Sequence, residues 1–146
     1  MNYSHYLAFF SSKKDPDAFA RFIQDVRQIV ESQPEGSNLC GQKRKEPPVI
    51  NDRSLIIGSS ENKGAFSRLE ILLDGPAPKH RYNLATINTQ RLPYDTVICA
   101  VLLAFVHHFP AAEVTSDGTS KDWAPAIALY QYATERKAPG IHLREG

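Results

Sequence analysis

The chain has 146 residues, of which 42% are hydrophobic and 23% are charged, and its formal net charge is +1. A chain of this length buries roughly 68–70% of the surface that its unfolded form exposes, so we expect residues 1–146 to form one globular domain. This composition excludes a disordered or fibrous protein. A net charge this small creates no bulk field toward nucleic acid or an anionic membrane, so any partner has to be recognised locally.

Cys40 and Cys99 are the only cysteines, which argues against a disulfide-stapled secreted scaffold. The start of the chain lacks a basic region followed by a long apolar stretch, and no run reaches the roughly 20 apolar residues that span a bilayer. We therefore expect a cytoplasmic, soluble protein without membrane association. Cys99 lies in an apolar run, whereas Cys40 lies near Lys43 and Arg44 and is expected to be the more reactive thiol.

The first elements are a strand and an amphipathic helix. The aromatic-rich segment 3–10 predicts a strand. Asp15 is a good helix cap and Pro16 suits the first helical position, so we expect a helix from there to about Gln33. Its apolar residues recur at helical spacing and form one stripe: Phe19, Phe22, Ile23, Val26, Ile29 and Val30. The polar segment 35–48 that follows predicts an exposed loop.

Three strands and a second helix are expected next. The first strand is predicted to be centred on Leu55-Ile56-Ile57 within residues 49–58. The others are predicted over residues 66–73 and 80–89, the last of them pairing antiparallel with the one before. The second helix should begin near Pro93 and run to about Phe109, before Pro110. Ten successive residues within it, Val97 to Val106, carry no charge and no strongly polar side chain. This pattern predicts a helix that is buried on all sides.

The C-terminal part predicts a short strand at residues 114–115, a turn at Ser116-Asp117-Gly118 and a third helix over residues 120–136. Thr119 stands three residues before Asp122, which resembles a capping box with Asp in place of Glu. Trp123, Ile127 and Tyr130 share one face of this helix. Residues 138–146 are expected to form a tail.

The resulting element order, βαβββαβα, indicates an α+β fold with a mostly antiparallel sheet and three helices. It contains the split strand-helix-strand arrangement of ferredoxin-like folds, with additions. A different sheet order built from the same elements stays open, since the sequence does not define which strands pair.

The first candidate binding site is the entry to the second helix, with Arg91, Tyr94 and Asp95. The unpaired amides of a helix N-terminus favour anions, and Arg91 could hold a carboxylate or phosphate while Asp95 orients it or accepts a proton. The alternative is structural: Asp95 complements the helix end and Arg91 pairs with Asp95 at the surface.

The second candidate site is the turn before the third helix, with Asp117, Asp122 and Trp123. Loops at the carboxyl ends of strands often bind ligands, and the Trp123 indole could face a planar ligand. The alternative is again structural, with Asp117 in a turn, Asp122 in the helix cap and Trp123 in the core.

Signatures of known chemistry are missing. No phosphate-binding glycine motif, H-E-x-x-H, paired C-x-x-C or G-x-S-x-G string occurs. Neighbouring His107 and His108 project about 100° apart on a helix and are poorly placed to chelate one ion. We expect no metal and no cofactor. The basic cluster 43–45 has no interleaved aromatic residues, so it predicts a solvated loop and gives no strong nucleic-acid signal.

Part of the chain resembles a recurring pattern of small uncharacterised proteins. The residues that carry it are Arg91-Leu92-Pro93-Tyr94-Asp95, His107-His108-Phe109, Ser116-Asp117-Gly118 and Asp122-Trp123. The resemblance covers about residues 50 to 130. It implies no activity, only that these positions belong together.

Two functional hypotheses follow. The first is a small binding or interaction module, such as a subunit, inhibitor or immunity-type protein, that recognises a protein partner or an anionic small molecule. The second is a small hydrolase or transferase with Asp95 or Asp117 as base and Arg91 as anion clamp. An enzyme should show a pocket into which at least two of the candidate polar residues point. A partner-binding module should expose an apolar patch of several hundred Å² or form a dimer contact, and the oligomeric state is left open.

Overall fold

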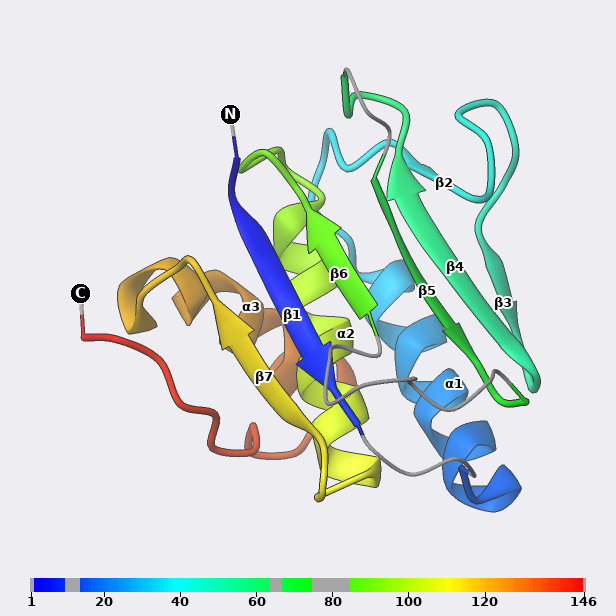
Figure 1. The fold of residues 1–146 in the computed structure, drawn as a ribbon, viewed down its shortest axis with the longest axis vertical. Coiled ribbons are helices and arrows are strands. Elements are labelled where there is room, and N and C mark those ends of the chain that lie inside the picture. The colour runs from blue at the N-terminus through cyan, green and yellow to red at the C-terminus, as the bar shows by residue number, and fades with distance from the viewer. Residues whose placement is uncertain (1, 10–13, 64–66, 75–84, 146) are drawn as a thin grey trace.

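The structure is a computed structural model, and it describes residues 2–9, 14–63, 67–74 and 85–145. Its strands form two antiparallel sheets, and the helices lie behind them (Figure 1). The first sheet has the order β6-β1-β7, formed by Ala85–Asn88, Ser4–Ala8 and Glu113–Ser116. In the second sheet, β4 (Ser54–Ser59) pairs with β2 (Leu39–Cys40), β3 (Val49–Asn51) and β5 (Arg68–Leu72). The predicted α+β class with three helices and antiparallel pairing is confirmed.

Helix α1 (Pro16–Glu31) begins where the capping signals place it. The Asp15 carboxylate accepts a hydrogen bond from the Asp17 backbone N–H at 3.3 Å, and Pro16 occupies the first turn. All residues of the predicted apolar stripe are buried except Val30, which is half-buried. The spacing of the apolar residues along the chain therefore predicted both this helix and its buried face.

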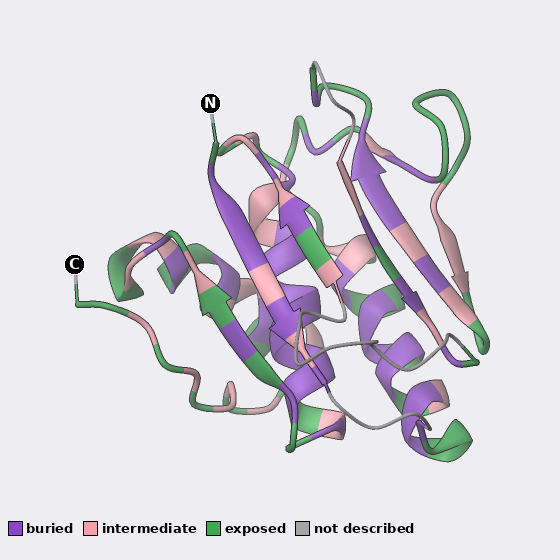
Figure 2. Cartoon of the chain, in the orientation of Figure 1, coloured by how far each residue is buried: buried purple, intermediate pink, exposed green. Residues whose placement is uncertain are grey.

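Helix α2 (Asp95–His108) is the predicted interior helix. Every residue from Val97 to Val106 is buried (Figure 2), and the helix packs against α1, α3 and the first sheet. A helix that is apolar on all sides is stable only when neighbours cover all of its faces, which explains this central position. No helix among the described residues is long and apolar enough to cross a membrane.

The second sheet confirms one prediction and corrects another. The strand expected around Leu55-Ile56-Ile57 is β4, and it forms a hairpin with β3, in which the Asn51 side chain accepts a hydrogen bond from the Arg53 N–H at 3.0 Å. The expected exposed loop 35–48 contains β2, which pairs with β4. Cys40 in β2 is buried, and burial raises the pKa of its thiol even though Arg44 lowers it. Cys40 is therefore not an exposed loop cysteine, whereas its being the more reactive of the two thiols stays a prediction.

The pairing of β6 also differs from the expectation. β6 pairs with β1, not with the preceding strand, and β5 pairs with β4. Residues 80–84 of the predicted strand, including His80, lie outside the described residues. All strand pairs in the described parts are antiparallel, so the central parallel pair of a ferredoxin-like sheet is not observed there.

Helix α3 (Ser120–Thr134) begins at the predicted capping box. The Asp122 carboxylate accepts from the Thr119 N–H at 2.9 Å, and the Thr119 hydroxyl accepts from the Asp122 N–H at 3.4 Å. Trp123 and Tyr130 are fully buried. The expected tail is held in place beside α3, because the Ser120 N–H donates to the Arg144 carbonyl at 2.8 Å.

A buried ionic cluster joins the three helices at the far end of α2. Asp25 of α1 accepts hydrogen bonds from His108 of α2 at 2.7 Å and from Arg136, which follows α3. Burial by itself raises the pKa of the Asp25 carboxyl, but the hydrogen bonds from His108 and Arg136 outweigh burial and hold this pKa below its usual value.

This cluster predicts a pH dependence of stability. Because the folded-state pKa of Asp25 is lowered, its contribution is present above the unfolded value of about 3.9 and is lost as the pH falls through the lower folded value. An Asp25→Asn variant lacks this titration. Urea unfolding between about pH 6 and pH 2 should therefore show a steeper loss of stability in the wild-type protein than in the variant. Parallel profiles would contradict the assignment.

Candidate functional site

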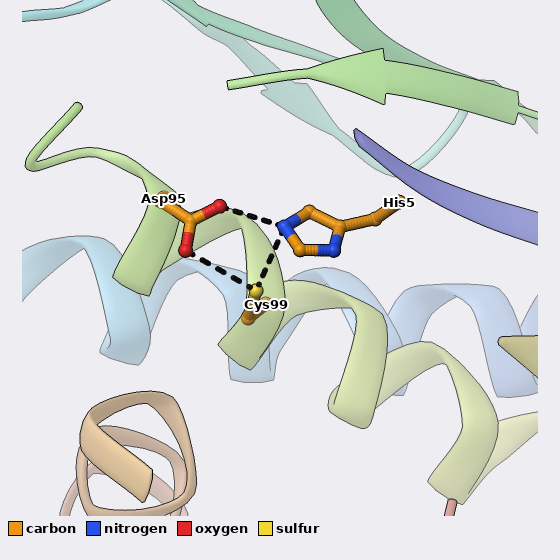
Figure 3. Close-up of side chains that lie close together, drawn as sticks. All are labelled: His5, Asp95 and Cys99. Atoms are coloured by element: carbon orange, nitrogen blue, oxygen red, sulfur yellow. Dashed lines mark hydrogen bonds and ion pairs between the residues drawn. The ribbon is translucent and has the colours of Figure 1, made fainter. Parts of the chain in front are cut away.

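His5 is the centre of a buried polar cluster between the first sheet and the helices. The pleat of β1 points Tyr3, His5 and Leu7 to the same, helix-covered side, and His5 is completely buried. Its Nε2 lies 2.7 Å from Asp95 Oδ1 at the start of α2, as Figure 3 shows. Its Nδ1 lies 2.7 Å from Ser116 Oγ at the end of β7.

The hydrogen bonds of Ser116 define which nitrogen of His5 carries the proton. Ser116 Oγ accepts from the Gly118 backbone N–H at 2.8 Å and from the Trp123 indole N–H at 3.0 Å. A hydroxyl has two acceptor sites and one proton, so its O–H must donate to His5 Nδ1. The proton of the neutral ring is then on Nε2, which donates to Asp95.

The same chain of bonds continues to Thr89, whose hydroxyl donates to Asp95 Oδ1 at 2.5 Å. We call Thr89, Asp95, His5, Ser116 and Trp123 the His5 network. It links the turn before α2 with β1, β7 and α3, and each of its side-chain groups has a partner. A buried network of hydrogen bonds of this kind holds the elements that contribute to it in one arrangement.

Cys99 brings a third metal-ligand type next to His5 and Asp95. It lies one helical turn after Asp95, with Sγ 3.3 Å from His5 Nε2 and 3.8 Å from Asp95 Oδ2 (Figure 3). Histidine, carboxylate and thiolate together suit zinc. However, Nε2 is protonated in the arrangement derived above, and burial raises the pKa of the Cys99 thiol well above its ordinary value. In this state the three groups do not form a ligand set.

Zinc therefore tests the hydrogen-bond assignment. We expect a small molar excess of Zn²⁺ to leave the melting temperature unchanged, because binding would have to displace the Nε2 proton and break the bond from Ser116. Cobalt should give no thiolate-to-metal absorption band. A rise in melting temperature that disappears in the Cys99→Ala variant would contradict the assignment.

Above the network, the two predicted sites meet at the surface. Arg91 Nη1 donates to Asp122 Oδ1 at 3.2 Å, and the guanidinium carbon lies 3.9 Å from the centre of the Tyr3 ring. The Arg91 side chain is 49% exposed. We call Tyr3, Arg91 and Asp122 the Arg91 surface. The expected surface pair of Arg91 with Asp95 is wrong, because α3 brings Asp122 to Arg91 while His5 and Thr89 engage Asp95.

The backbone before α2 is strained where it presents Arg91. Gln90 and Arg91 have φ angles of 56° and 57°, in the left-handed region. This conformation costs a residue with a Cβ about 1–2 kcal/mol, so the surrounding structure has to hold it. The Gln90 N–H donates to Asn88 Oδ1 at 3.1 Å, and the Leu92 N–H donates to the Thr89 carbonyl at 3.0 Å. Such strain is concentrated at functional sites.

The charges of the Arg91 surface stabilise one another. Hydrogen bonds from the Thr119 backbone and from Arg91 lower the pKa of the Asp122 carboxyl, and the bond to Asp122 raises the pKa of Arg91. Both groups are therefore ionised around neutral pH. Burial, and then the charge of Asp95, raise the pKa of the Tyr3 hydroxyl, which stays neutral beneath the guanidinium.

The other predicted site residues have structural contacts. Tyr94 is fully buried, its hydroxyl accepts from the Asn62 amide at 2.8 Å, and burial raises its pKa to about 12. Asp117 Oδ2 accepts from the Ser4 backbone N–H at 2.9 Å. Trp123 lies in the core and donates to Ser116. Asp122 belongs to the cap of α3, as the structural alternative for this residue predicted. It also forms an ion pair with Arg91.

The sequence interpretation placed Ser116 in the turn of the second candidate site, but it missed Tyr3, His5 and Thr89 as members of this region. Their signal was weak: Tyr3 and His5 alternate with Leu7 along one strand, which places them on the buried face but names no partner. A groove of about 340 Å³ does occur elsewhere, between β7, the end of α2 and Gly140 to His142, and no predicted site residue lines it.

Comparison of the chain with protein-family models, with curated proteins and with solved structures finds no match.

Proposed function

We propose that this protein is a small binding module that recognises an anionic group through Arg91. The observation that carries the proposal is the unused hydrogen-bonding capacity of the guanidinium. Arginine has five N–H donors, and within the described residues Arg91 donates only to Asp122. A carboxylate or phosphate is the ligand group that best matches such donors.

The surroundings of Arg91 support this proposal because they hold the side chain in place before a ligand arrives. Tyr3 lies beneath the guanidinium, Asp122 holds one of its nitrogens, and the left-handed turn presents it from a strained backbone. Holding a long side chain in its binding conformation reduces the entropy that binding would otherwise cost. The Arg91–Asp122 pair is also less exposed than the surface pair Arg53–Asp74. The side chains of Arg91 and Asp122 are 49% and 28% exposed, whereas those of Arg53 and Asp74 are 70% and 65% exposed.

A small anionic molecule is favoured over a protein partner as the ligand. Among the described residues, one large hydrophobic side chain is exposed: that of Tyr132, which is 76% exposed. A single exposed aromatic ring does not form the apolar patch expected of a protein-docking surface.

The contacts of the candidate bases favour binding over hydrolysis or group transfer. Asp95 already accepts from His5 and Thr89, and Asp117 accepts from the Ser4 N–H. Ser116 is linked through His5 to Asp95, which is the connectivity of a nucleophile, a base and an orienting carboxylate. However, both acceptor sites of Ser116 Oγ are occupied, so no electron pair is available for attack.

The test is a titration of the ¹⁵N-labelled protein with acetate and with inorganic phosphate, followed by NMR. We expect saturable shifts of the amides near residues 90–92 and 118–122, and at least a tenfold weaker response in Arg91→Ala, since a charge-assisted pair contributes about 1.5–3 kcal/mol. Arg53→Ala is the matched control, because it removes another exposed arginine that is paired with an aspartate. Equal responses of the wild-type protein and Arg91→Ala would disprove the proposal.

An Arg91→Gly variant separates loss of binding from loss of folding. Glycine adopts positive φ without the steric penalty, so this variant should be about 1 kcal/mol more stable to unfolding than Arg91→Ala. It should nevertheless bind as weakly as Arg91→Ala. Binding by Arg91→Gly at the wild-type level would show that the turn, and not the guanidinium, is responsible.

A further inference from the structure

We propose that the Arg91 surface takes a carboxylate that carries a neighbouring cationic group, as an α-amino acid does, and that it discriminates against phosphate. This inference rests on the proposed function, since it concerns the ligand of the same site. It comes from the balance of charge and of hydrogen-bonding groups around Arg91.

Among the described residues, the charges that act on Arg91 are those of two carboxylates, Asp122 and Asp95. Asp122 contacts the guanidinium at 3.2 Å, and the charge of Asp95 acts on both Arg91 and the Tyr3 hydroxyl beneath it. His5 adds no compensating charge, because the hydrogen bonds of Ser116 assign it a neutral ring. A dianion placed at Arg91 is therefore also repelled by two carboxylates, whereas a ligand without net charge is not.

Asp95, whose charge acts on Arg91, has unused acceptor capacity. Its Oδ1 accepts from both His5 and Thr89, whereas among the described residues Oδ2 faces the Cys99 thiol, a weak donor, at 3.8 Å. The Asp95 side chain is 16% exposed. Spare donors on Arg91 and a spare acceptor on Asp95 complement a carboxylate and an ammonium group on one molecule.

The expected size of the effect can be estimated from Coulomb's law. Two unit charges about 4 Å apart attract by about 1 kcal/mol in water, which corresponds to about a fivefold change in the binding constant. An ammonium group near Asp95 should therefore tighten binding several-fold relative to the same acid without it. A second negative charge should weaken binding by a similar factor.

The experiment compares glycine, acetate and inorganic phosphate as probes at about pH 8, where phosphate is largely a dianion. We expect glycine to bind about fivefold more tightly than acetate, and phosphate to bind most weakly. If all three probes depend on Arg91 but phosphate binds best, or glycine binds no better than acetate, the inference is wrong and the proposed function stands. If no probe depends on Arg91, the proposed function itself fails.

An Asp122→Asn variant adds a test within the protein. Asparagine keeps an oxygen for the Thr119 N–H in the helix cap and removes one negative charge beside Arg91. The ratio of phosphate to glycine affinity should rise severalfold in this variant. An unchanged ratio would show that the carboxylate charge does not govern the choice of ligand.

Discussion

Replacing Phe105 with alanine is expected to lower the free energy of unfolding by about 3–5 kcal/mol. The Phe105 ring is fully buried at the middle of an aromatic cluster. Its centre lies 5.2 Å from that of Phe22, 5.7 Å from that of Phe9 and 4.6 Å from that of Phe109. Truncation leaves a cavity between α1, α2 and the end of β1 that these rings cannot fill without leaving their present contacts.

A loss of this size is a large part of the 5–15 kcal/mol that stabilises a typical domain. Urea unfolding followed by circular dichroism measures it. Tyr132→Ala is the control, because this ring is 76% exposed and its removal should change stability by no more than about 0.5 kcal/mol. Similar values for the two variants would mean that α2 is not the interior helix described here.

The second large effect is expected from His5→Ala, which should cost about 2–4 kcal/mol. This substitution leaves Asp95 without its donor at 2.7 Å and the Ser116 hydroxyl without its acceptor, and it opens a cavity beside Trp123. Asp95 is 16% exposed and can recover part of its loss from water, which is why we place the cost below that of Phe105→Ala.

A double-mutant cycle identifies the network as the cause. The Ser116→Ala substitution should cost clearly less in the His5→Ala background than in the wild-type protein, because the hydroxyl has then already lost its acceptor. His107→Ala is the control, since this histidine is exposed and lies in the last turn of α2, at the opposite end from Asp95. Additive costs of His5→Ala and Ser116→Ala would contradict the hydrogen-bond assignment, and with it the neutral charge of His5 used above.

Several features could be predicted because they depend on neighbours along the chain. The stripe of α1 repeats at helical spacing, the Thr119–Asp122 cap spans three residues, and the apolar run of α2 is continuous. Each of these patterns predicts the element in which it occurs, without information from the rest of the chain. Arg91 and Asp122, which the sequence analysis places in two separate candidate sites, form an ion pair in the structure.

Other features depend on pairings between distant residues. Nothing near His5 in the chain indicates that Asp95 and Ser116 will reach its two nitrogens, because these residues are 90 and 111 positions away. The burial of Cys40 follows from the pairing of β2 with β4, and Cys40 looks exposed when its polar neighbours alone are read.

The sequence by itself determined the helices, their caps and the apolar interior of α2, because short-range periodicity and capping chemistry are complete within a few residues. Only the tertiary structure decided that β6 pairs with β1, that Arg91 pairs with Asp122 instead of Asp95, and that His5 joins Asp95 to Ser116. The physical reason is that strand register and hydrogen-bond partners are chosen by packing across the whole domain, which brings together groups that no local pattern connects.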